Sequence, residues 1–500
     1  MALLLDLSLP MRIPAPDRLN LKHVAIFVTL MFVGQELEGT DFVFASLTAV
    51  YTVLWATAFN ATGGIRYASG AYIFFNGFLN VIVGLGYKVL LGQAGDRNLQ
   101  APRATMVVYC VGMAALFVAA IVARALRTQK PLLAGLRSTE DYRHAAIICL
   151  VVGVLISGIT TLGGGNSVVS MLRQINKLPQ LAIMLATIYE IRRSNGARSL
   201  NFVGILSILF VFALGLISFG KEGMLLGFAA YIIAAVIEGY NFPRKQLVGT
   251  VVAFAFFSYY LVPYSQLVRN YRVATVSGNL VVAIHYLSNL QATREEYKTA
   301  IADFSITDEP HLYDEREGFM DRLIILPADD NLINYTNKGN VFGFFPTYAS
   351  YANLVPHFLW ASKPEFNTGN VYAHELGELA DEDNTTGISF SASADAYHQG
   401  KWLGLLLLLP FDIFLYFIIT DTVVGSARWA PWVLIPILDI TEIGSQGGLS
   451  SPVYLSFYGI LGVAFMIWVI KLGDSFVRRV SHPPRPTSPS VQTLNPISES

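Results

Sequence analysis

Charged residues are scarce in this chain. Only 14% of its 500 residues are Asp, Glu, Lys or Arg, whereas 53% are hydrophobic and the mean hydropathy is +0.49. Soluble domains carry roughly 25% charged residues, so this chain has too little charge to cover a water-facing surface of its size. The shortage excludes a soluble enzyme, a coiled coil, a disordered scaffold and a secreted disulfide framework.

Cysteine is almost absent as well. Cys110 and Cys149 lie inside apolar runs, where a cysteine is typically a small buried hydrophobic residue, and no disulfide or metal-binding spacing is present. The net charge of -1 comes without a basic stripe, which argues against nucleic acid as a partner. The segment 1–20 contains three prolines and lacks a signal-peptide cleavage pattern, so we expect no removal of a leader.

The chain instead has repeated apolar runs of about 20 residues, the length that crosses a bilayer core. Because a lipid-exposed backbone must satisfy its own hydrogen bonds, each run is predicted to be a helix. The sequence therefore predicts an all-α polytopic membrane protein with about twelve transmembrane helices. We expect these spans, of which the sixth and eleventh are short, at 21–38, 42–61, 70–91, 104–124, 144–162, 178–191, 201–219, 223–240, 247–263, 402–420, 430–444 and 452–472.

Lys and Arg are concentrated in every second short loop, with clusters at 124–143 and 192–198. The positive-inside rule makes these loops cytoplasmic, and both termini then lie on the cytoplasmic side. The intervening short loops hold far fewer cations, namely Arg97, Arg103, Arg173, Lys177 and Lys221.

This topology divides the chain into five parts. A cytoplasmic segment (1–20) precedes helices 1–9 (21–263), and a large outer loop (264–401) precedes helices 10–12 (402–472) and a Pro- and Ser-rich tail (473–500) that we expect to be disordered. The outer loop holds about half of the acidic residues and is expected to carry short helices. On the outer face it has no access to nucleotide sugars, so its substrate must arrive already activated.

The densest group of polar and aromatic residues in the outer loop lies between Gly343 and Gly404. It contains Val355-Pro356-His357-Phe358-Leu359-Trp360-Ala361-Ser362-Lys363-Pro364, then Thr385-Thr386-Gly387-Ile388, then Asp395-Ala396-Tyr397-His398-Gln399-Gly400. This arrangement resembles the bacterial oligosaccharide repeat-unit polymerases, the Wzy-type O-antigen and exopolysaccharide polymerases. Members typically show Ile-Pro-Arg-hydrophobic-Trp-Pro-x-Lys-Pro, a Thr-Gly segment and a Glu-Ala-Tyr-x-x-Phe-Gly-like turn. Here His357 replaces the arginine, Asp395 the glutamate and Gln399 the aromatic residue.

The resemblance implies a GT-C-like glycosyltransferase of the bacterial inner membrane that needs neither metal nor cofactor. Its substrates are the lipid-linked oligosaccharide donor and acceptor, whose polyprenyl-pyrophosphate-linked repeats it joins into O-antigen or exopolysaccharide. Membrane lipid, chain-length-determining proteins and flippase proteins are the partners that it implies.

Such a transfer needs fixed cations near the departing pyrophosphate and a base for the attacking hydroxyl. For the base and its partners we expect the catalytic residues Asp395, His398 and Glu378. Substrate binding is expected from Arg269, Arg272, Arg322, His357, Trp360, Lys363 and Tyr397. Because His357 stands where the motif has an arginine, we expect more of the phosphate binding to come from Lys363 and the arginines.

Each of these residues also has a structural interpretation. Arginines and aromatics anchor span ends at the interface, Lys363 sits in a turn, both histidines suit hydrogen-bonded structural positions, and Asp395 suits a helix cap. The acidic runs 329–330 and 381–383 are not taken as metal sites, because no nucleotide sugar reaches this face. Asp439 and Glu442 share one helix face and are expected to flank a polar cavity.

Three other functions remain open. An O-antigen-ligase-type enzyme shares the architecture and transfers the glycan to a different acceptor. A polysaccharide flippase or transporter predicts two matched halves, and the sequence shows no convincing internal repeat. An export scaffold predicts that the loop cations are replaceable.

Overall fold

The computed structural model describes residues 10–481, apart from 129, 137, 163–166, 274, 305–310, 315–319, 321–323, 385 and 445. Nearly all regular structure in this part of the chain is helical. Its two named strands, β1 (Met11–Arg12) and β2 (Asn241–Phe242), form one antiparallel pair of two residues each. The predicted all-α class is confirmed.

Seven helical stretches among the described residues are long and apolar enough to cross a membrane, and each overlaps a predicted span. They are Phe42–Thr62, Ala68–Leu90, Pro102–Leu126, Thr139–Thr161, Arg244–Tyr271, Ala392–Val423 and Ser450–Ser475. The other five predicted spans are helical but shorter. Their main helices are α1 (Leu21–Leu37), α8 (Leu178–Arg193), α9 (Phe202–Ile217), α10 (Lys221–Ile237) and α21 (Leu434–Asp439). Seventeen residues, as in α1, span only about 26 Å, so the number of twelve crossings stays a prediction.

Several of these stretches are interrupted by π-helical turns, where the backbone hydrogen-bond register shifts by one residue. The N-terminal half contains α2 (Phe42–Thr62), α3 (Ala68–Gly77), η2 (Phe78–Val83), α4 (Gly84–Leu90), α5 (Pro102–Leu126), α6 (Thr139–Leu162) and α7 (Ser167–Ile175). It is followed by α11 (Arg244–Phe256), η3 (Phe257–Leu261), α12 (Val262–Val268) and η4 (Arg269–Tyr271). The C-terminal part contains η5 (Gly404–Leu408), α20 (Leu409–Val423), η6 (Pro431–Val433), η7 (Ile440–Gly444), α22 (Ser450–Tyr454), η8 (Leu455–Gly459) and α23 (Ile460–Ser481). The π-helical turns are η2, η3, η5, η7 and η8, whereas η4 and η6 are short 3₁₀ helices.

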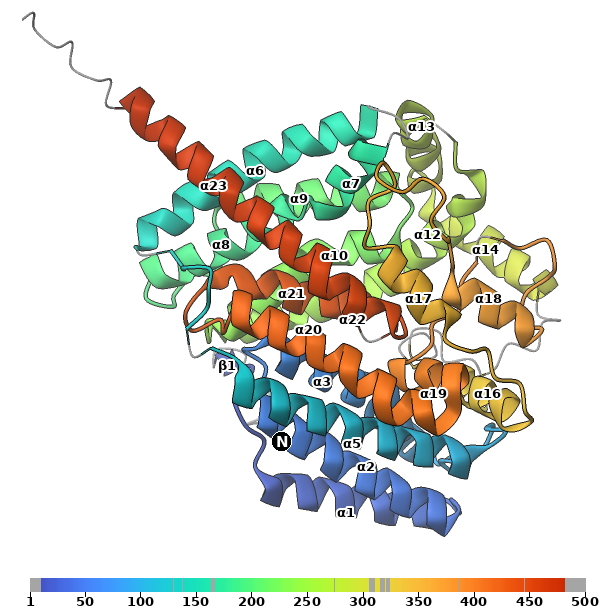
Figure 1. Ribbon diagram of the computed structural model, residues 1–500. Helices are drawn as coiled ribbons and strands as arrows, with labels where there is room; N and C mark the ends of the chain where they lie inside the picture. The colour runs from blue at the N-terminus through green and yellow to red at the C-terminus, as the bar shows by residue number, and fades with distance from the viewer. Residues whose placement is uncertain are drawn as a thin grey trace, which may run out of the picture.

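The long helices pack in two groups (Figure 1). In one group α2 packs against α5 and α5 against α20, and in the other α8 packs against α6, α9 and α10. Helix α23 packs against α6 and continues to Ser481, so residues 473–481 are helical, although the sequence suggests a disordered tail from 473.

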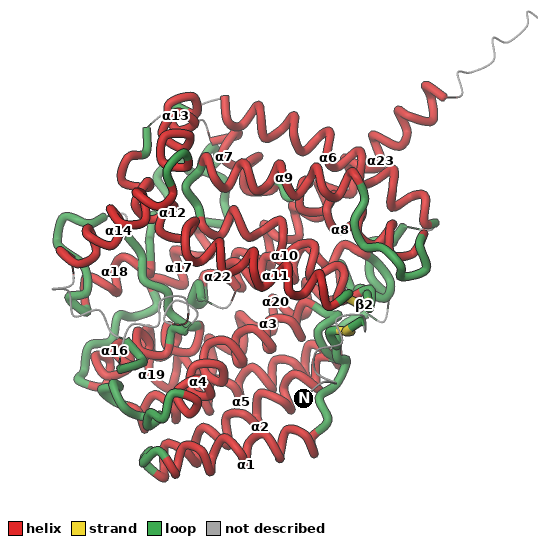
Figure 2. Tube along the Cα trace, turned by 180° about the vertical axis from the view of Figure 1, so that it is seen from behind, coloured by secondary structure: helices red, strands yellow, loops and turns green. Residues whose placement is uncertain are grey.

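The segment predicted as the outer loop folds into short helices that gather at one end of the bundle. The two ends of the described chain lie at the opposite end, as Figure 2 shows from behind. These short helices are α13 (Val276–Leu287), α14 (Leu290–Phe304), α16 (Leu326–Asn337), α17 (Phe345–Ala352), α18 (Thr368–Glu375) and α19 (Ala392–Leu403). Helix α19 leads into η5 and α20 through a kink at Lys401, whose φ is 48°.

Candidate functional site

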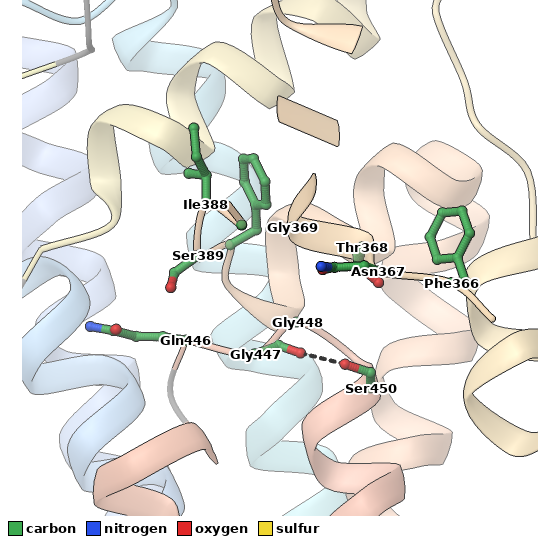
Figure 3. Close-up of a pocket in the computed structure, with 12 residues that line it drawn as sticks. Phe366, Asn367, Thr368, Gly369, Ile388, Ser389, Gln446, Gly447, Gly448 and Ser450 are labelled. Carbon is green, nitrogen blue, oxygen red and sulfur yellow. Dashed lines mark hydrogen bonds between the residues drawn. The ribbon is translucent and has the colours of Figure 1, made fainter. Parts of the chain in front are cut away.

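A cavity of about 380 Å³ lies among the short helices at this end of the bundle, and we call it the glycine-walled pocket (Figure 3). Three segments that are distant in sequence form its walls. They contribute Phe366, Asn367, Thr368 and Gly369, then Gly387, Ile388, Ser389 and Phe390, and finally Gln446, Gly447, Gly448 and Ser450. These lining residues carry no charged side chain. The walls consist of amides, hydroxyls, backbone groups and a few apolar side chains.

Backbone hydrogen bonds hold the three walls together. The Asn367 side chain caps α18, and the Ile388 amide donates to the Gly369 carbonyl at 3.1 Å. A side chain at position 369 would place its Cβ 2.4 Å from the Ile388 carbonyl oxygen, so this close approach requires glycine. On the other side the Gly448 amide donates to the Phe390 carbonyl at 2.9 Å.

Asp395 lies directly beneath the wall formed by Gly448. Its Oδ1 accepts hydrogen bonds from the Tyr372 hydroxyl at 2.9 Å and from Gln399 Nε2 at 2.8 Å, and its Oδ2 accepts from the Leu449 amide at 2.8 Å. The residue is 1% exposed. Asp395 therefore fixes the wall of the pocket from behind. It is not the helix cap either, because the Ser391 side chain caps α19.

His398, one turn further along α19, is equally buried. Its Nε2 donates to Glu375 at 3.0 Å, and its Nδ1 lies 2.8 Å from the Thr336 hydroxyl. The Tyr372 ring packs edge-on against the imidazole with centroids 4.6 Å apart. Both ring nitrogens have protein partners, so His398 ties α19 to α16 and α18.

Asp329, which the sequence suggested only as part of a discounted metal site, belongs to the same buried network. Its carboxylate accepts from the Tyr109 hydroxyl at 2.5 Å and from the Ser391 amide at 2.9 Å. Burial raises the pKa of Asp329 to about 7. Its neighbour Asp330 accepts from Thr105 at 2.6 Å. These carboxylates anchor α16 to α5 and α19, and the described residues contain no group of three acidic, His or Cys residues suited to a metal.

Replacing Asp329 by asparagine is expected to flatten the pH dependence of stability. The carboxyl has an ordinary pKa of 3.8 and about 7 when folded, so the folded state binds more protons between these values. Its contribution is therefore greatest below pH 4 and is lost as the pH rises through 7, on the order of 4 kcal/mol. Unfolding of the purified protein in detergent from pH 4 to 8 measures this slope. An unchanged slope in Asp329→Asn, or an equal change in the exposed control Asp381→Asn, would contradict the expectation.

The remaining predicted site residues do not line the pocket where the structure describes them. Glu378 accepts a hydrogen bond from Asn331 at 2.8 Å, and the Tyr397 hydroxyl donates to Asn337 at 2.8 Å. Trp360 is half-buried in the chain that follows α17. None of the nine predicted residues that the structure describes is among those that line the glycine-walled pocket, although Gly387 and Ile388 of the Thr-Gly segment are.

The predicted cations are dispersed. Arg269 and Arg272 are exposed at and just after η4, and Arg322 lies outside the described residues. His357 forms an exposed pair with Glu365 at 2.9 Å. The structure therefore brings Asp395, His398 and Tyr397 together on α19, but it does not collect the loop cations around the pocket.

Lys363 has a structural partner at the end of α17. Its ammonium donates to the carbonyls of Val355 at 2.8 Å and Asn353 at 3.2 Å, where a cation also complements the helix dipole. We expect Lys363→Ala to lower stability by about 1 kcal/mol and to leave glycan length unchanged. A melting curve and a glycan gel test this pair of outcomes. Loss of polymer at unchanged stability would instead support the phosphate-binding role that the sequence suggests.

No family model matches this chain, and no curated protein or solved structure is similar to it.

The arrangement is suited chemically to a neutral polar ligand. A pocket of this size, walled by amides, hydroxyls and backbone groups with three apolar side chains, is suited to orienting a small molecule or a sugar unit. The third wall has a sequence signal in Gln446-Gly447-Gly448, a glycine pair followed after Leu449 by two serines, which lies just beyond the predicted span 430–444.

Proposed function

We propose that this protein is a membrane glycosyltransferase that polymerises polyprenyl-pyrophosphate-linked oligosaccharide repeats on the outer face of the bacterial inner membrane. One observation carries the proposal: an uncharged, hydrogen-bonding pocket is walled by the Thr-Gly segment of the motif and is backed by the Asp395 of the next motif. The pocket adjoins helices that are long and apolar enough to cross a membrane, because Ser450, one of its lining residues, begins the stretch Ser450–Ser475.

The topology supports the same assignment. The short helices of the predicted outer loop gather at the end of the bundle opposite the described chain ends. With the cytoplasmic side assigned from Lys and Arg, both termini are cytoplasmic and the pocket faces the outer side. A sugar there needs prior activation, which a lipid pyrophosphate supplies.

The pocket acts by orientation in this proposal. Pyrophosphate is a good leaving group, so holding the acceptor hydroxyl close to the donor sugar provides much of the acceleration. Asn367, Ser389 and Gln446 offer hydrogen bonds to sugar hydroxyls from three different walls. Asp395 is a positioning residue, because it holds the Leu449 amide and the adjoining glycines in place.

Deletion of the gene in its host, with the surface glycan separated on a gel, tests this function. Loss of the ladder with single repeats still attached to the final acceptor is the expected result. Full-length polymer that stays on the lipid carrier would indicate a ligase instead. An unchanged ladder would overturn the assignment.

A further inference from the structure

A second cavity, of about 250 Å³, lies where α7 and the start of α8 meet α21 and the C-terminal helices. We call it the cationic cavity. Its lining is Arg173, Gln174, Ile175, Lys177, Ile435, Asp439, Tyr454, Tyr458, Gly459, Gly462 and Met466. In the sequence, Arg173 and Lys177 indicate only the topology, whereas the pair Asp439 and Glu442 predicts a polar cavity. The side chain of Glu442, the other half of that expectation, lies outside the described residues.

The charges of this cavity are arranged for an anion. Arg173 is exposed and donates from Nη2 to the Thr160 carbonyl at 2.5 Å, one of five donors on a guanidinium. Lys177 Nζ lies 3.2 Å from Asp439 Oδ1, and the Asp439 side chain is nearly buried. Two cations against one carboxylate give the three groups a formal charge of +1. A phosphate that enters competes with Asp439 for Lys177 and binds the arginine fork directly.

Two aromatic side chains also line the cavity. The rings of Tyr454 and Tyr458 stack with centroids 5.3 Å apart and an angle of 30° between their planes. The Tyr458 hydroxyl donates to the carbonyl of Leu354, just after α17, at 3.2 Å. The cavity is thus joined to the same group of short helices that surrounds the glycine-walled pocket.

Helix α22 connects the two cavities. Ser450, its first residue, lines the glycine-walled pocket, and Tyr454, its last residue, lines the cationic cavity. Four residues of helix rise about 6 Å, which is comparable to the length of one sugar unit. A residue that lines the uncharged pocket and a residue that lines the cationic cavity therefore lie about one helical turn apart on α22.

We propose that the cationic cavity binds the pyrophosphate of a polyprenyl-linked sugar through Arg173 and Lys177, with the sugar directed past α22 toward the glycine-walled pocket. This inference rests on the proposed function and names the part of the site that holds the lipid carrier. It assigns the phosphate contact to two residues outside the motif, in place of the dispersed cations of the outer loop.

Binding of undecaprenyl pyrophosphate to the purified full-length protein in nanodiscs tests the proposal. Arg173→Gln and Lys177→Gln are each expected to weaken binding about tenfold or more, whereas Arg173→Lys keeps the charge but loses the planar fork and is expected to weaken binding less than Arg173→Gln. Lys298→Gln is the matched control, since this cation lies on the exposed helix α14 and pairs with Glu295. Melting curves of every variant establish that it is folded.

Preference for undecaprenyl pyrophosphate over phosphatidylglycerol and over inorganic pyrophosphate supports the lipid carrier as the ligand. Equal affinity for phosphatidylglycerol would show a general anionic-lipid site and overturn the proposal, as would unchanged binding in both glutamine variants. The proposed function and the proposed pyrophosphate site can be rejected independently, because different experiments test them. An unchanged glycan after gene deletion would reject the polymerase function. Carrier binding that is the same in Arg173→Gln and Lys177→Gln as in the unchanged protein would reject only the role of the cationic cavity.

Discussion

Asp395→Ala is expected to abolish the glycan polymer and to lower the free energy of unfolding by about 3 kcal/mol or more. The substitution removes the acceptor of three buried hydrogen bonds and leaves the donors of Tyr372, Gln399 and Leu449 without it. Each buried donor left unsatisfied costs about 1–3 kcal/mol. The Leu449 amide belongs to the segment that walls the pocket, so its release also disturbs the binding surface.

The measurement combines a glycan gel in the deletion strain with thermal unfolding of the purified variants. Asp395→Asn separates the effect of shape from the effect of charge. Asparagine keeps one acceptor oxygen, but its NH2 group replaces the second oxygen and places a donor against the surrounding donors. We expect intermediate stability and strongly reduced polymer. Glu365→Ala is the control, since this carboxylate is exposed and pairs only with His357 among its described contacts. A ladder of normal length in Asp395→Ala would reject the positioning role.

The helical architecture follows from local features of the sequence. Apolar runs of bilayer length predict helices because the backbone has no other way to satisfy its hydrogen bonds in lipid. All twelve predicted runs contain helix in the structure, and the outer segment contains short helices as expected. The apolar pattern does not predict the kink at Gly400 and Lys401, because both residues precede the apolar run 402–420 and their backbone torsions leave no trace in the run.

The walls of the glycine-walled pocket could not be predicted from local sequence patterns. The contact of Phe390 with Gly447 joins segments on either side of two apolar runs, and no local periodicity encodes which strand-like segment meets which loop. Asp395 was identified from its motif, but its burial beneath Gly448 comes from this long-range contact. The sequence therefore predicted a catalytic role for Asp395, whereas its buried position is suited to holding the wall of the pocket in place.

The surroundings of the candidate phosphate-binding cations could not be predicted from local sequence patterns either. Charge density in the outer loop drew attention to Lys363 and His357, whose partners turn out to be the carbonyls that follow α17 and a neighbouring carboxylate. Arg173 and Lys177 lie in a short connection of low charge density. They acquire a chemical context because Tyr454 and Tyr458, from a distant part of the chain, line the same cavity.

Gly448→Ala is expected to remove the polymer as completely as the loss of Asp395. Position 448 has a φ of +59°, which costs an alanine roughly 1–2 kcal/mol. A Cβ there would also lie 2.5 Å from Asp395 Oδ2, so the wall or the carboxylate must move. Because Leu449 donates to that same oxygen, any such movement breaks the hydrogen bond that shapes the pocket.

Gly377→Ala is the matched control for this substitution. Gly377 follows α18 with a φ of +73°, and a Cβ there meets no atom within 4 Å. The two alanine variants share the backbone strain and differ in the collision with Asp395. We expect Gly377→Ala to melt a few degrees lower with a normal glycan ladder, and Gly448→Ala to lose the ladder. Equal loss of polymer in both variants would attribute the effect to strain alone, and a normal ladder in Gly448→Ala would show that the wall of the pocket takes no part in the reaction.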